Sequence, residues 1–241
     1  MSCEGLVKPC VSEIERMLDI SRISDETEAR GWSLFNERNT PTAEYFNLHF
    51  PRLFSKYPFK SIPRILRPYT QSDAPVGSLS SRVGLQAQPP HTDYAYLPDP
   101  PRYILLRCER PGEKQCPTIV WTLDWKSLVR DRPADLVRNG WLIQSSPQNR
   151  FYGTVVETEP DGMPTVRFDA FCMTPPLGAG SVGCATNCLQ SYAASTVIEY
   201  SEGDCVLLDN WRVLHARGDG ADEAPSRRLQ RWTSAGKYIG V

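Results

Sequence analysis

The chain has 241 residues, of which 40% are hydrophobic and 23% charged, and its formal net charge is −1. These values are typical of a globular protein with one sizeable core, and we expect a single domain over residues 1–241. Acids and bases are mixed along the chain, which excludes a basic nucleic-acid surface, and no apolar run approaches the roughly 20 residues that cross a bilayer. The first residues lack the apolar core of a secretory signal, so we expect a cytoplasmic location.

Residues 1–75 are expected to be mostly helical and to brace or cover the rest of the chain. The segment Val11–Ile20 carries apolar residues at helical spacing, and Ser24 opens a segment typical of a capped helix start. The proline-rich stretch 57–71 breaks this pattern.

Residues 76–238 change to short β-like runs separated by turn residues, with one helical insert near 123–139. Many short strands with an inserted helix predict a mainly β fold with flanking helices, of the double-stranded β-helix class (a jelly-roll, cupin-like barrel). The expected strands are Ser80–Gln86, Tyr103–Cys108, Thr118–Thr122, Phe151–Glu157, Thr165–Phe168, Val197–Tyr200, Cys205–Leu208, Val213–His215 and Arg228–Ser234.

Histidine is scarce, which makes the setting of each one informative: the chain contains only His49, His91 and His215. In an extended chain, positions two apart point the same way, so His91 and Asp93 would face a common centre. His215 would complete a two-histidine, one-carboxylate set, which leaves positions open on iron(II). A loop histidine beside an N-capping aspartate is the alternative for the tripeptide alone, and His49 lies outside any ligand spacing.

The C-terminal stretch adds two arginines to this set. If residues 207–215 and 226–234 form an antiparallel hairpin, His215 lies roughly opposite Arg227 and Trp211 opposite Arg231, and all can face one side. A buried arginine needs an anionic partner, which a dicarboxylate such as 2-oxoglutarate supplies. Solvated arginines on an edge strand are the alternative. The eight cysteines are scattered, and we assign them no role.

The order of these motifs resembles the taurine dioxygenase and clavaminate synthase-like family of iron(II)/2-oxoglutarate-dependent oxygenases. The resemblance rests on HTD, Thr118, DNWRVLH and RRLQRW, and covers roughly residues 80 to 235. It implies iron ligation by His91, Asp93 and His215. It also implies that Arg231 and Thr118 bind the far carboxylate of 2-oxoglutarate and that Arg227 lies near its iron-side carboxylate.

The same resemblance implies an activity that uses iron(II), 2-oxoglutarate and O2: hydroxylation of a small polar molecule, such as an amino acid or a related carboxylate or amine, with formation of succinate. Aspartate at position 93 favours hydroxylation over halogenation. Desaturation, epoxidation and ring closure stay open, as do a cupin-like iron enzyme without 2-oxoglutarate and a non-catalytic jelly-roll binding module. Candidates for substrate contact, with core packing or surface ion pairing as their alternatives, are Tyr94, Tyr96, Trp211 and Arg107.

Overall fold

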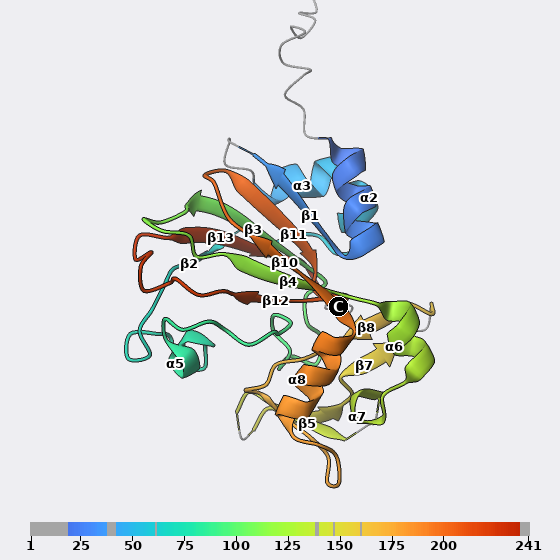
Figure 1. Cartoon of the computed structure of the whole chain (residues 1–241). Helices are drawn as coiled ribbons and strands as arrows, with labels where there is room; N and C mark the ends of the chain where they lie inside the picture. Colours follow the sequence, from blue (N-terminus) through green and yellow to red (C-terminus); the bar gives the residue numbers. More distant parts are fainter. Residues whose placement is uncertain are drawn as a thin grey trace, which may run out of the picture.

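The computed structural model describes residues 19–37, 42–60, 62–137, 140–146, 148–159 and 161–236. Its centre is a pair of antiparallel sheets (Figure 1). The five-stranded sheet has the order β1 (Trp32–Asn36), β11 (Asp204–Asp209), β3 (Tyr103–Arg110), β13 (Arg228–Thr233), β2 (Arg64–Leu66). The three-stranded sheet has the order β10 (Ala193–Ile198), β4 (Thr118–Leu123), β12 (Val213–Arg217). In both sheets the early strands β1–β4 pair only with strands that begin after residue 190.

The two sheets pack face to face through alternate side chains of their strands. Ile104, Leu106 and Leu208 of the five-stranded sheet are buried against Val120 and Val213 of the three-stranded sheet. Because side chains alternate along a strand, the intervening residues of β3, β11 and β13 point to the opposite face of the larger sheet. The space between the sheets is therefore mainly aliphatic, and any polar group in it requires a reason.

Helices cover the outer faces of both sheets. Helices α2 (Ile20–Arg30), α3 (Ala43–His49) and α4 (Pro51–Phe54) bury a group of phenylalanines against the larger sheet. On the smaller sheet lie α6 (Trp125–Asp131), α7 (Ala134–Val137) and α8 (Val182–Ser191), together with two small sheets (Figure 1). One of these sheets has the strand order β6 (Arg150–Gly153), β5 (Trp141–Gln144), β9 (Met173–Thr174). The other pairs β7 (Val156–Thr158) with β8 (Pro164–Val166). None of the helices in the described ranges has the length and apolar character needed to cross a membrane.

The prediction of a mainly β fold with flanking helices is confirmed, and six of the expected strands appear within two residues as β3, β4, β8, β11, β12 and β13. The helical insert is confirmed as α6 and α7, which are separated by Pro133, a residue that cannot continue a helix; residues 138 and 139 lie outside the described residues. The described part of residues 1–75 is less helical than expected, because β1 and β2 join the larger sheet.

Three expectations are wrong. Residues Ser80–Gln86 are not a strand, since they form the short helix α5 (Ser80–Val83) and a turn. Ser24 does not start a helix, because the N-cap of α2 is Asp19; most of Val11–Ile20 lies outside the described residues. Strands β12 and β13 do not form a hairpin, since β12 pairs with β4 and β13 with β2 and β3. They face each other from opposite sheets instead.

Candidate metal centre

The side chains of His91, Asp93 and His215 form one buried cluster between the sheets. Their candidate ligand atoms all lie within 4.8 Å of one another. Asp93 is the central member, with one carboxylate oxygen 4.0 Å from His91 Nε2 and the other 3.8 Å from His215 Nε2. These separations leave room for one metal ion among the three side chains.

Backbone pairing sets the two histidines side by side. His215 lies in the middle of β12, and His91 lies on an extended segment that meets it in an isolated β-bridge. The His91 amide donates to the His215 carbonyl at 3.0 Å, and the His215 amide donates to the His91 carbonyl at 2.9 Å. Thr92, between the ligands, points the other way and its hydroxyl accepts from the Phe168 amide at 3.1 Å. The alternation expected for an extended HxD segment is thus realised.

Asn210 holds the backbone of Asp93. Its side-chain oxygen accepts from the Asp93 amide at 2.7 Å, and its side-chain nitrogen donates to the Asp93 and Pro101 carbonyls, each at 2.9 Å. Asn210 lies in the turn between β11 and β12, and only 1% of it is exposed. The sequence interpretation noted the DN pair but gave Asn210 no role.

The electrostatic setting of His215 and Asp93 suits a metal ion. The Pro89 carbonyl lies 2.9 Å from His91 Nδ1, which places a proton on that nitrogen and directs Nε2 toward the cluster as the atom that would bind a metal. Burial and the neighbouring His91 lower the pKa of His215 to about 3, although Asp93 opposes them, so His215 is neutral at pH 7. Burial alone would raise the pKa of Asp93, but Arg231 and both histidines outweigh it and lower that pKa. Two neutral imidazoles and a carboxylate are the ligand set of many non-haem iron(II) sites.

Arg231 contacts the carboxylate of this cluster directly. Its Nη1 lies 2.9 Å from both oxygens of Asp93, and its Nη2 donates to the Tyr94 hydroxyl at 3.1 Å. Tyr94 follows Asp93 in a left-handed conformation, with φ of 59°, and the Arg231 guanidinium lies 5.0 Å from the centre of its ring. The Tyr96 ring lies 6.0 Å from that of Tyr94. Both tyrosines therefore belong to the surroundings of the cluster.

Arg227 lies in a second buried polar group. Its guanidinium is 5.6 Å from the ring of Tyr200, whose hydroxyl donates to the Thr118 hydroxyl at 2.9 Å. Arg227 is 4% exposed, its Nε has no hydrogen-bond partner, and no carboxylate pairs with it in the part of the chain that the structure describes.

Arg217 adds a further cation to this group. It lies opposite Thr118 and two positions beyond His215 on β12, so the polar part of the strand's inner face runs from His215 to the end at Arg217. Its guanidinium donates to the Gly84 and Gln86 carbonyls, each at 2.6 Å. Burial and the charge of Arg227 lower the pKa of Arg217. Neither buried arginine pairs with an acid among the described residues, so this positively charged group favours an anion.

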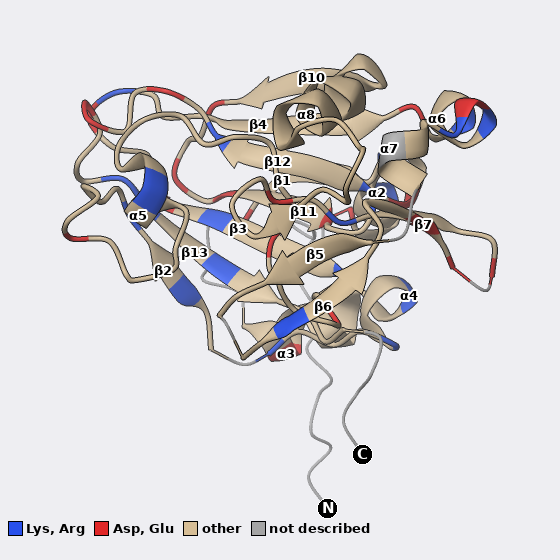
Figure 2. Cartoon of the chain, turned by 90° about the horizontal axis from the view of Figure 1, so that it is seen from below, with Lys and Arg blue, Asp and Glu red and all other residues tan. Residues whose placement is uncertain are grey.

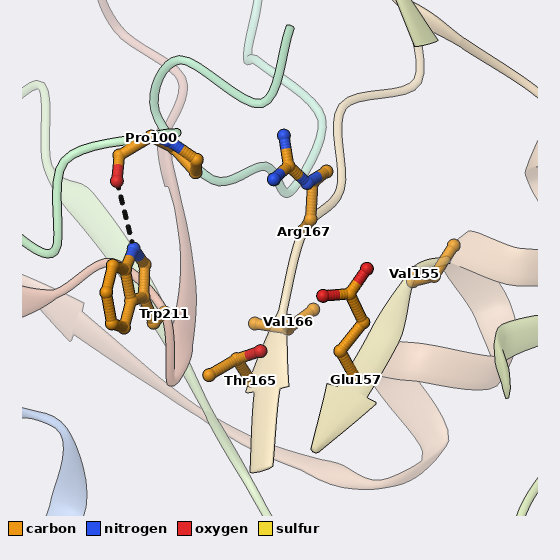
Figure 3. Close-up of a pocket in the computed structure, with 7 residues that line it drawn as sticks. All are labelled: Pro100, Val155, Glu157, Thr165, Val166, Arg167 and Trp211. Carbon is orange, nitrogen blue, oxygen red and sulfur yellow. Dashed lines mark hydrogen bonds between the residues drawn. The ribbon is translucent and has the colours of Figure 1, made fainter. Parts of the chain in front are cut away.

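Two of the expected substrate contacts lie away from the cluster. Arg107 shares the outer face of β3 with Tyr103 and Leu105, and its Nε donates to the Glu37 carbonyl at 3.3 Å. Trp211 lies in the turn after β11, where its indole donates to the Pro100 carbonyl at 3.1 Å (Figure 3). With Arg167 and Glu157 among its neighbours, it lines a cavity of about 20 Å³, which is large enough for about one water molecule and too small for a substrate.

Sequence reasoning also left Tyr200 and Arg217 without a role. The even spacing of Arg217 from His215 was a signal that could have found it, because both residues lie on one face of the strand. Tyr200 lies just beyond β10 and carries no such signal, since its contact with Thr118 spans 82 positions of the sequence.

No family model matches the sequence, and no curated protein matches it. Solved structures do. The non-haem iron oxygenase OrfP in complex with Fe and alpha-ketoglutaric acid superposes with a TM-score of 0.62 over 92% of this chain and 79% of its own, at 17% identity. OrfP with (3S)-hydroxy-L-Arg gives a TM-score of 0.63 with the same identity and coverage. Asparagine oxygenase in complex with Fe(II), 2S,3S-3-hydroxyasparagine and succinate gives 0.63 over 94% of this chain and 80% of its own, at 12% identity. The chain thus has the fold of these non-haem iron oxygenases.

Proposed function

We propose that the protein is an iron(II)- and 2-oxoglutarate-dependent oxygenase that hydroxylates a small polar molecule of the amino-acid class. One observation carries the proposal. A buried cluster of two histidines and an aspartate lies in the same inter-sheet space as Arg227, a buried cation without an anionic partner among the described residues. A metal ion explains the cluster, and a dicarboxylate that reaches from the metal to Arg227 explains the arginine.

The positions of Arg231 and Arg227 support roles that are the reverse of those that the resemblance implied. Arg231 already contacts both oxygens of Asp93, so it lies too close to the metal ligands to grip the far end of a cosubstrate. We assign it to the iron-side carboxylate. Arg227 lies beside Tyr200 and Thr118, away from Asp93, and we assign Arg227 and Thr118 to the far carboxylate. The guanidinium would form charge-assisted hydrogen bonds there, and Thr118 would add a hydroxyl.

The chain itself supplies positioning and a low-dielectric setting. When bound, iron(II) supplies dioxygen activation coupled to decarboxylation of 2-oxoglutarate to succinate and carbon dioxide, with transfer of one oxygen atom to the substrate. His91, Asp93 and His215 would hold the metal, while Asn210 keeps the Asp93 backbone in place. The aliphatic residues between the sheets exclude water from this space, which strengthens each contact with an anion.

The solved structures support the amino-acid class of substrate, since OrfP and asparagine oxygenase are described with a hydroxylated arginine and a hydroxylated asparagine. We retain the expectation of a cytoplasmic enzyme with a small-molecule substrate. A cupin-like iron enzyme that does not use 2-oxoglutarate, and a binding module without turnover, are outcomes that the following experiment separates.

The test is anaerobic titration of the iron(II) protein with 2-oxoglutarate, followed by the visible charge-transfer band of the chelate. Loss of the contacts to one carboxylate is worth about 3–4 kcal/mol, so Arg227→Ala should weaken 2-oxoglutarate binding by about a hundredfold or more. Arg228→Ala is the matched control, because the adjacent Arg228 is partly exposed and pairs with Glu109. It should bind 2-oxoglutarate as the wild type does.

Each outcome has a distinct meaning. A band that forms in the wild type and in Arg228→Ala but not in Arg227→Ala supports 2-oxoglutarate as the cosubstrate and Arg227 as the residue that binds its far carboxylate. Iron binding without any band refutes the use of 2-oxoglutarate and leaves the cupin-like enzyme. A band without succinate formation in air, even over a panel of amino acids, identifies a binding module. A band that survives in Arg227→Ala but is lost in Arg231→Ala restores the assignment that the resemblance implied.

A further inference from the structure

Arg64 is a second arginine on the inner side of the larger sheet, at its edge. It begins strand β2, and its Cα is the direct cross-strand partner of Arg231 on β13. Residues directly opposite each other in an antiparallel pair point to the same face, with Cβ atoms about 5 Å apart. The neighbouring pair confirms this face, since Leu66 packs with Leu229 in the core between the sheets. Arg64 therefore projects on the side where Arg231 meets Asp93.

This arrangement opposes two positive charges across one pair of strands. Like charges directly opposite each other destabilise a sheet, and a protein usually offsets them with an acid. Arg231 has its acid in Asp93, whereas Arg64 forms neither a hydrogen bond nor an ion pair in the ranges that the structure describes. Figure 2 shows the basic positions of β2 and β13 on adjacent strands. The charge of Arg64 is thus available to a ligand.

Arg64 lies on the solvent-exposed side of Arg231 and the metal centre. Arg64 is exposed, while Arg231 and Asp93 behind it are largely buried. The Tyr96 ring lies 6.0 Å from that of Tyr94, whose hydroxyl accepts from Arg231, and the charges of Arg64, Arg231 and Asp93 all act on the Tyr96 hydroxyl. Burial increases from exposed Arg64 to half-buried Tyr96 and buried Asp93, so these residues extend from the surface toward the candidate metal ligands.

We propose that Arg64 is a specificity-determining residue that binds the carboxylate of the substrate at the mouth of the metal centre, with Tyr96 as a neighbouring hydroxyl donor. This inference rests on the proposed function and narrows its substrate class to molecules with a free carboxylate. An anion at this position offsets the repulsion between Arg64 and Arg231, so the bound substrate stabilises the edge of the sheet. A molecule held by its carboxylate at the mouth extends its other atoms toward Asp93.

The test compares acids with their neutral carboxamides in the iron(II) enzyme. Succinate formation is measured with each of the common L-amino acids, and every acid that stimulates turnover is compared with its carboxamide. In the wild type the acid should have a KM about tenfold below that of the carboxamide, which corresponds to one partly exposed charge-assisted contact. Arg64→Gln should raise the KM of the acid about tenfold with little change in kcat and remove the preference, and Arg64→Lys should restore part of it.

Arg67→Gln is the matched control, because Arg67 is also exposed, three residues away, and contacts only the ring of Tyr69 in the described structure. It should behave as the wild type. Equal KM values for acid and carboxamide in the wild type, or an unchanged KM in Arg64→Gln, overturn the proposal. So does a wild type that forms the 2-oxoglutarate chelate but that no amino acid stimulates. Absence of the chelate band refutes the oxygenase function itself, so the two failures are distinguishable.

Discussion

Asn210 offers the sharpest test of how the fold prepares the metal site. Its side chain forms three buried hydrogen bonds, of 2.7, 2.9 and 2.9 Å, and two of them hold the peptide groups on either side of Asp93. Asn210→Ala removes all three and leaves their partners unsatisfied. At about 1–2 kcal/mol for each bond, the free energy of unfolding should fall by about 3–5 kcal/mol. Loss of a group that orients a ligand should also weaken metal binding by about 10- to 100-fold.

The control is Asn47→Ala, which removes a similar clamp far from the metal centre. The Asn47 side chain accepts from the Phe59 amide at 2.7 Å and donates to the Phe59 carbonyl at 3.2 Å. Urea unfolding measures stability, and anaerobic calorimetric titration with iron(II) measures affinity. Both variants should lose stability, and only Asn210→Ala should lose affinity. If Asn210→Ala binds iron(II) within about twofold of the wild type, Asn210 does not position Asp93. If that variant does not fold, Asn210→Ser provides a smaller perturbation for the same comparison.

Three further predictions concern the fold around the site. Gly220 has φ of +88°, and an added Cβ would lie 2.5 Å from a backbone oxygen, so Gly220→Ala should lower the free energy of unfolding by about 2–4 kcal/mol. Gly162 has a similar φ of +85° but open space around it, so Gly162→Ala should lower the free energy of unfolding by only about 1 kcal/mol. Urea unfolding measures both. Burial raises the pKa of Tyr200 from 10.0 to about 12, so the free energy of unfolding should fall by about 2–3 kcal/mol as the pH rises from 10 to 12. Tyr200→Phe should make this fall smaller. Equal dependence of stability on pH in the wild type and in Tyr200→Phe would contradict the raised pKa of Tyr200. Iodoacetamide should label exposed Cys184 in the native protein while buried Cys205 reacts only on unfolding, as peptide mass spectrometry will show.

The cluster of His91, Asp93 and His215 was predictable from the sequence because its signal is local. His91 and Asp93 lie two positions apart, and His215 ends an expected strand in a chain with few histidines. Strand alternation predicted that Arg227 and Arg231 share one face for the same reason. Both signals depend on the geometry of a single extended segment, which needs no knowledge of its neighbours.

What the sequence could not predict are the pairings between distant segments. Alternation along β12 and β13 is compatible with a hairpin and also with two facing sheets, and the protein adopts the second arrangement. Strand β2 has only three residues and exposes two of them, so it has no apolar pattern to detect. Residues Ser80–Gln86 alternate like a strand, yet Arg217 holds their carbonyls in a turn from β12. In each case a long-range contact overrides the local preference.

The interleaving of early and late strands has a consequence for how the protein folds. Strand β3 lies between β11 and β13, and β4 lies between β10 and β12, so about 70 or more positions separate the partners in each of these pairs. Contacts of such long range carry a large loop-closure entropy and slow the search for the native state. Neither sheet can assemble on a ribosome before the segment from β10 to β13 has emerged, and until then β3 and β4 expose unpaired apolar edges. The cluster of His91, Asp93 and His215 should therefore form late in folding, when β12 pairs with β4 and brings His215 beside the HTD segment.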